Sequence, residues 1–511
     1  MRYLPDGIRM KAADTYTIQE LGIPSLILME RAALGVVQVM EERGMDLTRA
    51  LIVCGSGNNG GDGFAVARLL SEKGLTPEVL FAGRESSLSE ECAVQKRIVE
   101  KLGIPVFTEL PEQEYTVIID AVFGVGLSRE ISGRYLEVIE WMNAQPGRKA
   151  AIDIPSGVCA RTGRILGTAF QAELTVAMAC VKLGCELYPG KSAAGETAAV
   201  QIGISPAYFK GDRRVCFTYD REDLPLLLPP RRADSHKGTY GRVLMITGSS
   251  GMAGAACLAG WAAYGTGAGL IQIYTAQDNR QILQEALPEA IVTCYEDYDR
   301  ETHAELLAWA DVICIGCGLG KSRVSEQLLI QTLKYLETNE KPCIIDADGL
   351  NLLSTQMEQL EALADREVPV ILTPHMKEMS RLTGKSVEWI AENRQEVLDE
   401  FVSRYPAVCV LKDSRTMAAQ KEHPTFVNLA GNSAMAKAGS GDVLAGVITG
   451  LAAQGMDPFD SAALGVYLHA CGGDEAWRRK GSYSVLARDL IAGVEECMAQ
   501  AERCGRTSAA V

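Results

Sequence analysis

The chain has 511 residues, of which 47% are hydrophobic and 23% charged, and its formal net charge is −15. The composition is that of a globular protein, and the length exceeds what one hydrophobic core normally fills, so we expect at least two domains. The negative charge argues against an electrostatic nucleic-acid binder, but it is compatible with small anionic ligands held by backbone N–H groups.

The N-terminal segment and the cysteines indicate a cytoplasmic protein. Residues 1–22 carry acids early and contain no long apolar stretch, so they do not resemble a signal peptide, and no apolar run is long enough to span a bilayer. The 15 cysteines are scattered through apolar runs, as expected for reduced, buried thiols. The C-x-x-C at 314–317 has no second Cys/His pair at metal spacing, so we interpret it as core and loop.

Short apolar runs alternate with amphipathic segments over the first half of the chain. We expect strands at 49–55, 76–83, 115–124, 149–157 and 174–180, and helices at 61–74, 91–103 and 134–145. This alternation predicts a parallel sheet with helices on both faces.

The pattern is interrupted at 217–240 and then resumes. Three prolines fall within the six residues 225–230, which is typical of a domain boundary. We then expect strands within 241–251, 270–275, 310–320, 343–353, 368–384 and 406–414, and helices at 253–269, after the strand in 368–384, and at about 441–454. The sequence therefore predicts two α/β domains, 1–217 and 225–507, each a three-layer α/β/α arrangement.

A glycine-rich motif, GSGNNGGDG at 55–63, joins the first buried strand to a helix. Glycines let a backbone approach a phosphate closely, and a helix N-terminus offers free N–H groups and a positive dipole end. Asn58, Asn59 and Asp62 are polar additions to a plain dinucleotide motif, and no G-K-[ST] follows as in a P-loop. Phosphate binding is favoured over the alternative, a turn capped by Asn and Asp.

Polar side chains also follow two later strands of the same predicted sheet. Asp120 ends one strand, and Asp153 and Ser156 follow the next. Ligands of parallel sheets bind outside the carboxyl ends of the strands, and hard oxygen donors suit an alkali or alkaline-earth cation or sugar hydroxyls. One such Asp alone is usually a helix cap, but polar ends on adjacent strands predict a binding site.

The motifs GNNGGDG, DAVFGVG and DIPSG, preceded by MKAADTYTIQELGIPSLILMERA, resemble the Rossmann-like NAD(P)H-hydrate epimerase domain of the bifunctional NAD(P)H-hydrate repair enzymes over about 1–215. The resemblance implies a K⁺ site at Asn59, Asp120 and Ser156. It implies interconversion of the R and S forms at C6 of the hydrated nicotinamide ring, with Asp120 as the proton-handling group or its orienter. The implied substrate contacts are Asn58, Asn59, Gly60, Gly61, Asp62, Gly124, Val125, Gly126, Leu127, Ser128, Arg129, Glu130 and Asp153.

Two motifs of the second half suggest phosphoryl chemistry. In ILTPHMKEMSRL, Thr373 and Pro374 are expected as N-cap and first residue of a helix, which puts His375 in the first turn. In NSAMAKAGSGDVLAGVITGLAAQG, Gly439–Gly441 precede Asp442 and an apolar helix. The N–H groups of that helix start would face a transferring phosphoryl group, with Asp442 beside the accepting hydroxyl. The alternative is an acid stabilised by the helix dipole.

These motifs, with KGTYGRVLMITGS, GTGAGL and DADGLNLL, resemble the ribokinase-like superfamily and more closely the ADP-dependent NAD(P)H-hydrate dehydratase domain over about 225–505. The resemblance implies Mg²⁺, and ADP as co-substrate. Two positions depart from the family: Cys317 replaces a common Pro, and Asp413 a usual Gly, where an acid would repel the nucleotide. The implied hydrate contacts are Ala255 or Ala256, Gly318, His375 and Asp442, and the implied nucleotide contacts are Lys412, Asp413, Ser414, Arg415, Thr416 and Gly441.

The sequence thus predicts a cytoplasmic, homo-oligomeric enzyme that epimerises NAD(P)H hydrates and dehydrates the S form with ADP, without nucleic-acid or membrane partners. In the expected mechanism Asp442 activates the C6 hydroxyl for phosphorylation, and the phosphate then leaves. Two alternatives stay open: a small-alcohol kinase of the same superfamily fused to a nucleotide-binding domain, and a nucleotide-binding module without catalysis.

Overall fold

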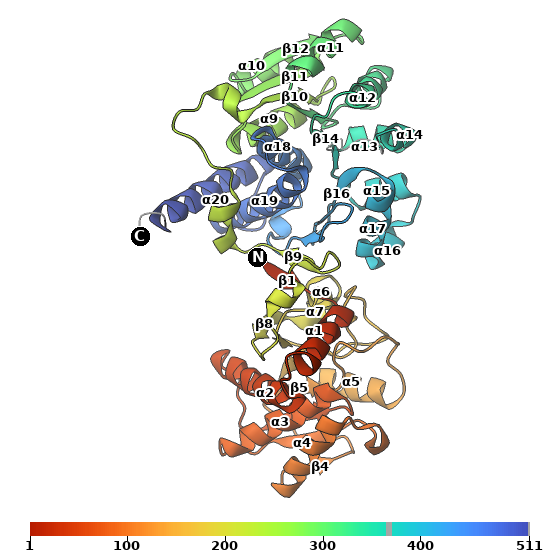
Figure 1. The fold of residues 1–511 in the computed structure, drawn as a ribbon, viewed down its shortest axis with the longest axis vertical. Helices are drawn as coiled ribbons and strands as arrows, with labels where there is room; N and C mark the ends of the chain where they lie inside the picture. The colour runs from red at the N-terminus through yellow and green to blue at the C-terminus, as the bar shows by residue number, and fades with distance from the viewer. Residues whose placement is uncertain (364–369, 509–511) are drawn as a thin grey trace. The chain divides into compact units, whose positions relative to one another are not determined.

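The computed structural model describes residues 1–363 and 370–508, and the chain divides into two compact units (Figure 1). One unit is Tyr3–Cys216, and the other combines Met1–Arg2 with Phe217–Val511. The predicted α/β class is confirmed, because each unit is built on a largely parallel sheet flanked by helices. Among the described residues no helix has the length and apolar character needed to cross a bilayer.

The sheet of the Tyr3–Cys216 unit has the doubly wound strand order of dinucleotide-binding proteins. Its seven strands pair in parallel in the order β4-β3-β2-β5-β6-β7-β8. The chain builds one side outward from β2 and then the other side from β5, so the binding crevice is expected outside the carboxyl ends of these two strands. The strands are β2 (Ala50–Cys54), β3 (Glu78–Phe81), β4 (Val106–Phe107), β5 (Val117–Ala121), β6 (Arg148–Ile152), β7 (Leu174–Met178) and β8 (Glu196–Val200).

Helices cover both faces of this sheet, because successive side chains of a strand point to opposite sides. On β2, Ile52 packs into the core shared with α2 and α3, whereas Leu51 packs into the core shared with α5. The helices are α1 (Gly7–Gln19), α2 (Ser25–Glu42), α3 (Asn58–Glu72), α4 (Glu90–Lys101), α5 (Arg134–Ala144), α6 (Leu183–Glu186) and α7 (Gly190–Ala194).

The second unit is built on an eleven-stranded sheet in the order β1-β9-β18-β17-β16-β15-β14-β13-β10-β11-β12. The strands from β12 to β16 in this order are parallel, and β16, β17 and β18 form antiparallel pairs. The strands are β1 (Arg2–Leu4), β9 (Cys216–Thr218), β10 (Arg242–Ile246), β11 (Leu270–Ala276), β12 (Ile291–Tyr295), β13 (Val312–Ile315), β14 (Cys343–Ile345), β15 (Val370–Leu372), β16 (Ala407–Leu411), β17 (Met417–Ala419) and β18 (Phe426–Val427).

The helix α18 (Ser440–Ala453) lies at the centre of this unit and is buried from Val443 to its end. It packs closely on α9, since a Cβ on Gly446 would lie 2.3 Å from the carbonyl oxygen of Ala259. The other helices are α8 (Leu224–Leu227), α9 (Ala253–Gly265), α10 (Arg280–Ala286), α11 (Arg300–Trp309), α12 (Arg323–Leu336), α13 (Asp348–Leu353), α14 (Glu358–Glu361), α15 (Met376–Thr383), α16 (Val387–Glu392), α17 (Arg394–Arg404), α19 (Pro458–Lys480) and α20 (Ala487–Ser508).

Two helix starts differ from the sequence-based expectation. Helix α3 begins at Asn58 rather than at 61, because Gly57 is extended and the following glycines are already helical. Helix α15 is capped by His375 rather than Thr373: its Nδ1 accepts hydrogen bonds from the N–H groups of Lys377 and Glu378. Residues 368–369 of the strand expected before α15 lie outside the described residues.

Candidate active sites

A cavity of about 990 Å³ opens at the carboxyl ends of the strands in the Tyr3–Cys216 unit, a volume that suits a nucleotide. Its wall is formed by α1, α2, the start of α3 and the segments that follow β3, β5, β6, β7 and β8. The predicted contacts Gly60, Gly61 and Glu130 lie outside this wall. The predicted contacts within it are Asn58, Asn59, Asp62, Gly124, Val125, Gly126, Leu127, Ser128, Arg129 and Asp153.

Gly60 and Gly63 of the GSGNNGGDG motif pack α3 closely against the sheet, and the expectation that the motif admits a phosphate stays a prediction. A Cβ on Gly60 would lie 2.0 Å from the carbonyl oxygen of Gly55, and one on Gly63 would lie 2.6 Å from the Cβ of Ala121. Gly57 differs, because it caps α3, lines the cavity and has open space around its Cβ position. The helix start, rather than the glycine run, is therefore what faces a ligand.

Asp120 lies fully buried at the end of β5, below the cavity wall. Its carboxylate accepts hydrogen bonds from the N–H of Val122 (3.1 Å), the hydroxyl of Ser156 (2.7 Å) and the N–H of Ser156 (2.7 Å). Burial raises the pKa of Asp120 to about 6, and the bonds from Ser156 and Val122 oppose that rise. The enclosed geometry favours an orienting role over direct contact with a substrate.

The residues predicted to hold K⁺ combine the Asn59 amide with a carboxylate and a hydroxyl, those of Asp120 and Ser156, that are hydrogen-bonded to each other. Asn59 is buried, and its Nδ2 is enclosed without a hydrogen-bond partner, so this N–H group is open to an acceptor atom of a ligand, while a cation would have to bind Oδ1. Together with Asp120 and Ser156 it offers one carboxylate and neutral oxygens, the donor set of a hard ion of low charge. Over residues 1–363 and 370–508, no group of three or more His, Cys, Asp or Glu side chains is arranged to hold a metal ion.

Three carboxylates and a lysine gather in the cavity wall. The Lys182 ammonium is fully buried and pairs with Asp153 Oδ1, which also accepts a hydrogen bond from the N–H of Met178. Asp153 has a φ of +68°, which non-glycine residues rarely adopt. Burial and the carboxylates of Asp153 and Asp14 raise the pKa of Asp62 well above its usual range, with Lys182 opposing them.

The sequence analysis missed Lys182 and Asp14. A signal for Lys182 was present, because a single lysine interrupts the apolar run VAMACVKLGC at the end of a predicted strand. Such a buried ammonium needs a carboxylate partner, and Asp153 follows the neighbouring strand. Asp14 lies on α1, which no strand-end argument could place at this site.

In the second unit Asp442, the predicted catalytic base, lies in the first turn of α18. The N-cap of this helix, Gly439, has a φ of +87°, the left-handed region that favours glycine. Burial and the carboxylate of Asp346 raise the pKa of Asp442 to about 6, while a hydrogen bond from the Cys317 thiol and the charge of Lys412 lower it. At neutral pH this carboxylate is therefore an ionised base of increased strength.

An ion pair lies against the same helix start. Lys412 Nζ is 2.5 Å from Asp346 Oδ1, and a Cβ on Gly441 would lie 3.6 Å from that ammonium. Burial lowers the pKa of Lys412, but Asp346 and Glu378 outweigh it and hold the pKa above its usual value. A fixed cation beside free helix N–H groups is the arrangement that stabilises a phosphoryl group.

His375 lies next to Lys412, and burial followed by the charge of Lys412 lowers the pKa of His375. Since its Nδ1 accepts the cap bonds of α15, Nε2 is the ring nitrogen that carries a proton in the neutral ring, and it lies 3.4 Å from the Glu378 carboxylate. Two other predicted contacts, Ala255 and Gly318, pack directly on each other, and Ala256 is fully buried beneath them.

Cys317 and Asp413, the two departures from the family pattern, have partners in the fold. Cys317 is fully buried and its thiol is hydrogen-bonded to Asp442. Asp413 pairs with Arg394, whose Nε lies 2.9 Å from Asp413 Oδ2. The Arg394 guanidinium offsets the charge of this carboxylate, and the effect of Asp413 on a nucleotide stays a prediction. The rest of the predicted nucleotide segment, through Thr416, forms the turn between β16 and β17.

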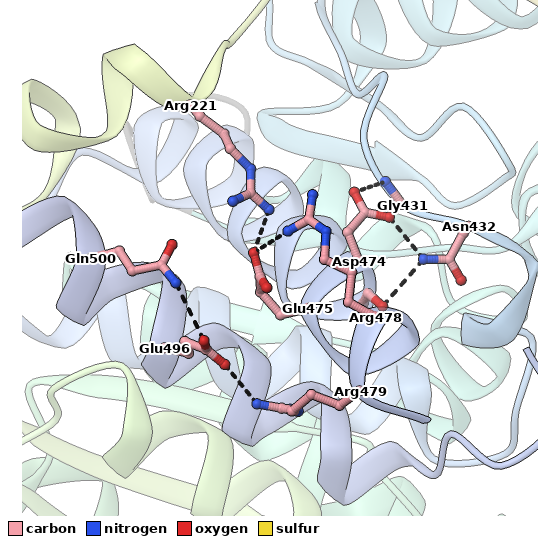
Figure 2. Close-up of polar contacts among 10 residues, drawn as sticks. Arg221, Gly431, Asn432, Asp474, Glu475, Arg478, Arg479, Glu496 and Gln500 are labelled. Atoms are coloured by element: carbon pink, nitrogen blue, oxygen red, sulfur yellow. Dashed lines mark hydrogen bonds and ion pairs between the residues drawn. The ribbon is translucent and has the colours of Figure 1, made fainter. Parts of the chain in front are cut away.

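Helix α19 holds the segment that leads into α18 (Figure 2). Asp474 accepts hydrogen bonds from the N–H of Gly431 (3.1 Å) and the amide of Asn432 (2.8 Å). One turn from there, His469 is buried with its Nε2 3.3 Å from the hydroxyl of Ser440. Burial lowers the pKa of His469 to about 4, so the ring stays neutral beneath the helix start. Both contacts position the amides of α18.

Fold and sites together define the class of the protein: a doubly wound nucleotide-binding unit joined to an α/β unit with a phosphoryl-transfer type of helix start. Residues 25–184 match the family described as YjeF-related protein N-terminus, and residues 243–495 match the family described as NAD(P)H-hydrate dehydratase.

A bifunctional NAD(P)H-hydrate repair enzyme of Moorella thermoacetica is 36% identical over 96% of this chain and 95% of its own length. One of Escherichia coli is 33% identical over 93% and 90%. A solved ribokinase-like superfamily protein of Enterococcus faecalis is 29% identical, with a TM-score of 0.50, over 57% of this chain and 98% of its own. The chain belongs to the bifunctional NAD(P)H-hydrate repair enzymes.

Proposed function

We propose that this chain repairs hydrated nicotinamide nucleotides in two steps: the Tyr3–Cys216 unit interconverts R and S NAD(P)H hydrates, and the other unit dehydrates the S form at the expense of ADP. The observation that carries the proposal is that each unit has its own helix start faced by its own proton-handling carboxylate, Asp62 in one and Asp442 in the other. Two separate reaction centres fit the two activities of the family.

In the first unit, Asp62 and Asp153 handle the protons at C6. The lone pair of the ring nitrogen forms a C6=N bond as the C6–O bond breaks, and the hydroxyl leaves as water with a proton from Asp62. Water then adds to the opposite face and gives a proton to Asp153, whose anionic form Lys182 stabilises. The two carboxyl groups exchange roles in the reverse direction. Asn59, Asp120 and Ser156 would hold K⁺, which would neutralise the charge of the Asp120 carboxylate.

In the second unit, Asp442 removes the proton from the C6 hydroxyl as its oxygen attacks the terminal phosphorus of ADP, and AMP leaves. The N–H groups of Gly439 and Gly441 and the Lys412 ammonium stabilise the charge on the transferring group, and Mg²⁺ bound with the nucleotide would add to that stabilisation. The ring nitrogen then expels phosphate and a ring proton is lost, which regenerates the dihydronicotinamide. A phosphate is a far better leaving group than hydroxide.

The small-alcohol kinase alternative would use the same Asp442 and Lys412, but it would leave the cavity of the Tyr3–Cys216 unit without a role. Binding without catalysis would leave unexplained why Asp442 is held as a strengthened base beside a phosphoryl site. The family membership favours repair over both alternatives.

The proposal is tested with purified protein, a mixture of R and S hydrates, and ADP present or absent. We expect the absorbance of NADH to return in full with ADP, through continuous conversion of R into S, and R to equilibrate with S when ADP is omitted. Omitting K⁺ should slow only the conversion of R into S. A stable phosphorylated product would favour the kinase alternative, and ligand binding without any turnover would favour the binding module.

A further inference from the structure

The cavity of the Tyr3–Cys216 unit has a cationic feature that the repair chemistry does not use. Arg84 and Ser87 line the cavity from the segment that follows β3. In the order β4-β3-β2-β5, β3 is the strand next to β2 on the side away from β5. In doubly wound sheets of this order, the end of that strand meets the ribose of the adenosine half of a dinucleotide.

The backbone of Arg84 is fixed beside the start of α3. The hydroxyl of Ser56 accepts a hydrogen bond from the N–H of Arg84 (2.8 Å) and donates one to the carbonyl oxygen of Arg84 (3.2 Å). A Cβ on Gly83 would lie 2.3 Å from the same hydroxyl, so the two loops are in direct contact. Arg84 therefore begins next to the helix N–H groups that would hold a pyrophosphate.

The charges around Arg84 leave its guanidinium available to an anion. The neighbouring Glu85 turns toward α4, where its carboxylate is 2.8 Å from the ammonium of Lys96. Within the described residues the Arg84 side chain has no ion-pair partner. The Asp153 carboxylate follows β6, which lies three strands from β3, or ~14 Å at about 4.8 Å per strand.

An acidic residue at the end of this strand reads a free ribose 2′-hydroxyl, whereas an arginine accommodates a 2′-phosphate. Here β3 ends at Phe81 and is followed by Ala82, Gly83 and Arg84. The first acid after the strand is Glu85, which pairs with Lys96. We propose that Arg84, assisted by the Ser87 hydroxyl, forms a 2′-phosphate subsite, so that the epimerase unit prefers NADPH hydrate to NADH hydrate. The inference rests on the proposed function for its substrate.

The test compares Arg84→Gln with the native protein on the two hydrates, in the absence of ADP so that only epimerisation proceeds. We expect kcat/KM for NADPH hydrate to fall roughly 10- to 100-fold, the loss of one charge-assisted pair, and kcat/KM for NADH hydrate to change less than about twofold. Arg84→Lys should recover part of the preference, since an ammonium keeps the charge but not the bidentate geometry. Arg97→Gln, an equal charge change on the exposed face of α4, should alter neither value.

Equal losses with both hydrates would overturn the inference and would assign Arg84 to the pyrophosphate. No loss with either would overturn it as well. If the native protein epimerises neither hydrate, the proposed function fails, but the subsite is still measurable: hydrogen exchange over residues 78–90 should slow more with NADP⁺ than with NAD⁺, and Arg84→Gln should abolish that difference. Equal protection by both dinucleotides would then exclude the subsite.

Discussion

The starts of α3 and α18 make an instructive pair, because both follow glycine-rich motifs and both face a candidate active site. At α3 the space that a Cβ of Gly60 or Gly63 would occupy already holds other atoms of the protein. Of the motif's glycines, Gly57 is the one that lines the cavity. At α18 Gly439 provides a left-handed turn, and the space beside Gly441 holds the Lys412–Asp346 ion pair.

The acids near the two helix starts differ as well. Asp62 lies one turn inside α3, and burial together with the neighbouring carboxylates raises its pKa well above the usual range, which suits a proton donor. Asp442 lies in the first turn of α18, with a pKa of about 6, which suits a base at neutral pH. A glycine-rich helix start therefore indicates an anion site, but its chemistry is decided by the charged groups that tertiary packing adds. Five changes test this contrast.

The largest effect is expected for Asp442→Asn. Asparagine fits the first turn of α18 but cannot accept a proton, so dehydration of S hydrate should fall by about 10²–10⁴-fold while epimerisation and ADP affinity stay close to native. Rates of NADH recovery and of R-to-S conversion are measured on the same preparation. Dehydration within a few-fold of native would exclude Asp442 as the base, and loss of both activities would show that the two centres are coupled.

Lys182→Met should act on the other unit alone. It leaves Asp153 buried without its cation, which is expected to cost about 3–5 kcal/mol of stability and to slow epimerisation by roughly 10²-fold. Hydrogen exchange of residues 117–180 in urea reports the stability of this unit. The matched control is Arg43→Met, which removes an exposed pair with Glu196 and should cost less than about 1 kcal/mol. Similar effects for the two variants would contradict the assignment of Lys182.

Gly60→Ala separates the packing of α3 from ligand binding. A Cβ 2.0 Å from the Gly55 carbonyl forces the helix away from β2, so we expect a loss of about 1–3 kcal/mol in the free energy of unfolding. Gly57→Ala meets open space and should cost less than about 1 kcal/mol, but it should weaken nucleotide binding at the cavity. Thermal unfolding and dinucleotide titration distinguish them. A stable Gly60→Ala protein with weakened binding would indicate that the glycines serve phosphate binding and not the packing of α3.

The two reactions should respond differently to acid. A base with a pKa of about 6 is ionised above that pH, so kcat/KM for dehydration should fall about tenfold per pH unit below 6. Burial and the neighbouring carboxylates raise the pKa of Asp62, so acid favours the proton-donating form of this group, and epimerisation should be less sensitive to acid than dehydration. Profiles of both activities between pH 5 and 8 are the measurement. Parallel profiles would show that one shared group limits both reactions.

The smallest effect is expected for Asp413→Gly. The variant removes a carboxylate that already pairs with Arg394, so ADP affinity should stay equal or improve by up to about fivefold, with a stability cost of about 1 kcal/mol or less. Calorimetric titration with ADP gives both the affinity and the stoichiometry. A clear loss of affinity would mean that Asp413 itself contacts the nucleotide.

Local patterns in the sequence determined a good part of this protein. The alternation of apolar runs with amphipathic segments predicted the α/β class, and the acids after predicted strands indicated a binding site at the strand ends, where Asp153 lines the cavity. These predictions succeed because strand burial and helix periodicity are local properties of the chain. The homo-oligomeric state, the K⁺ and Mg²⁺ requirements and the cytoplasmic location stay predictions.

Tertiary structure decided what the local patterns left open. Lys182 meets Asp153 across 29 residues and Arg394 meets Asp413 across 19, so neither pair shows in a motif. The close packing of Gly60 and Gly63 on Gly55 and Ala121 is not visible in the motif, because only the folded sheet brings these residues together. Sequence by itself determines which segments can be strand, helix or anion-binding turn, since those preferences act over a few residues. The partner of each buried charge and the neighbour of each glycine depend on long-range packing, which the complete fold alone defines.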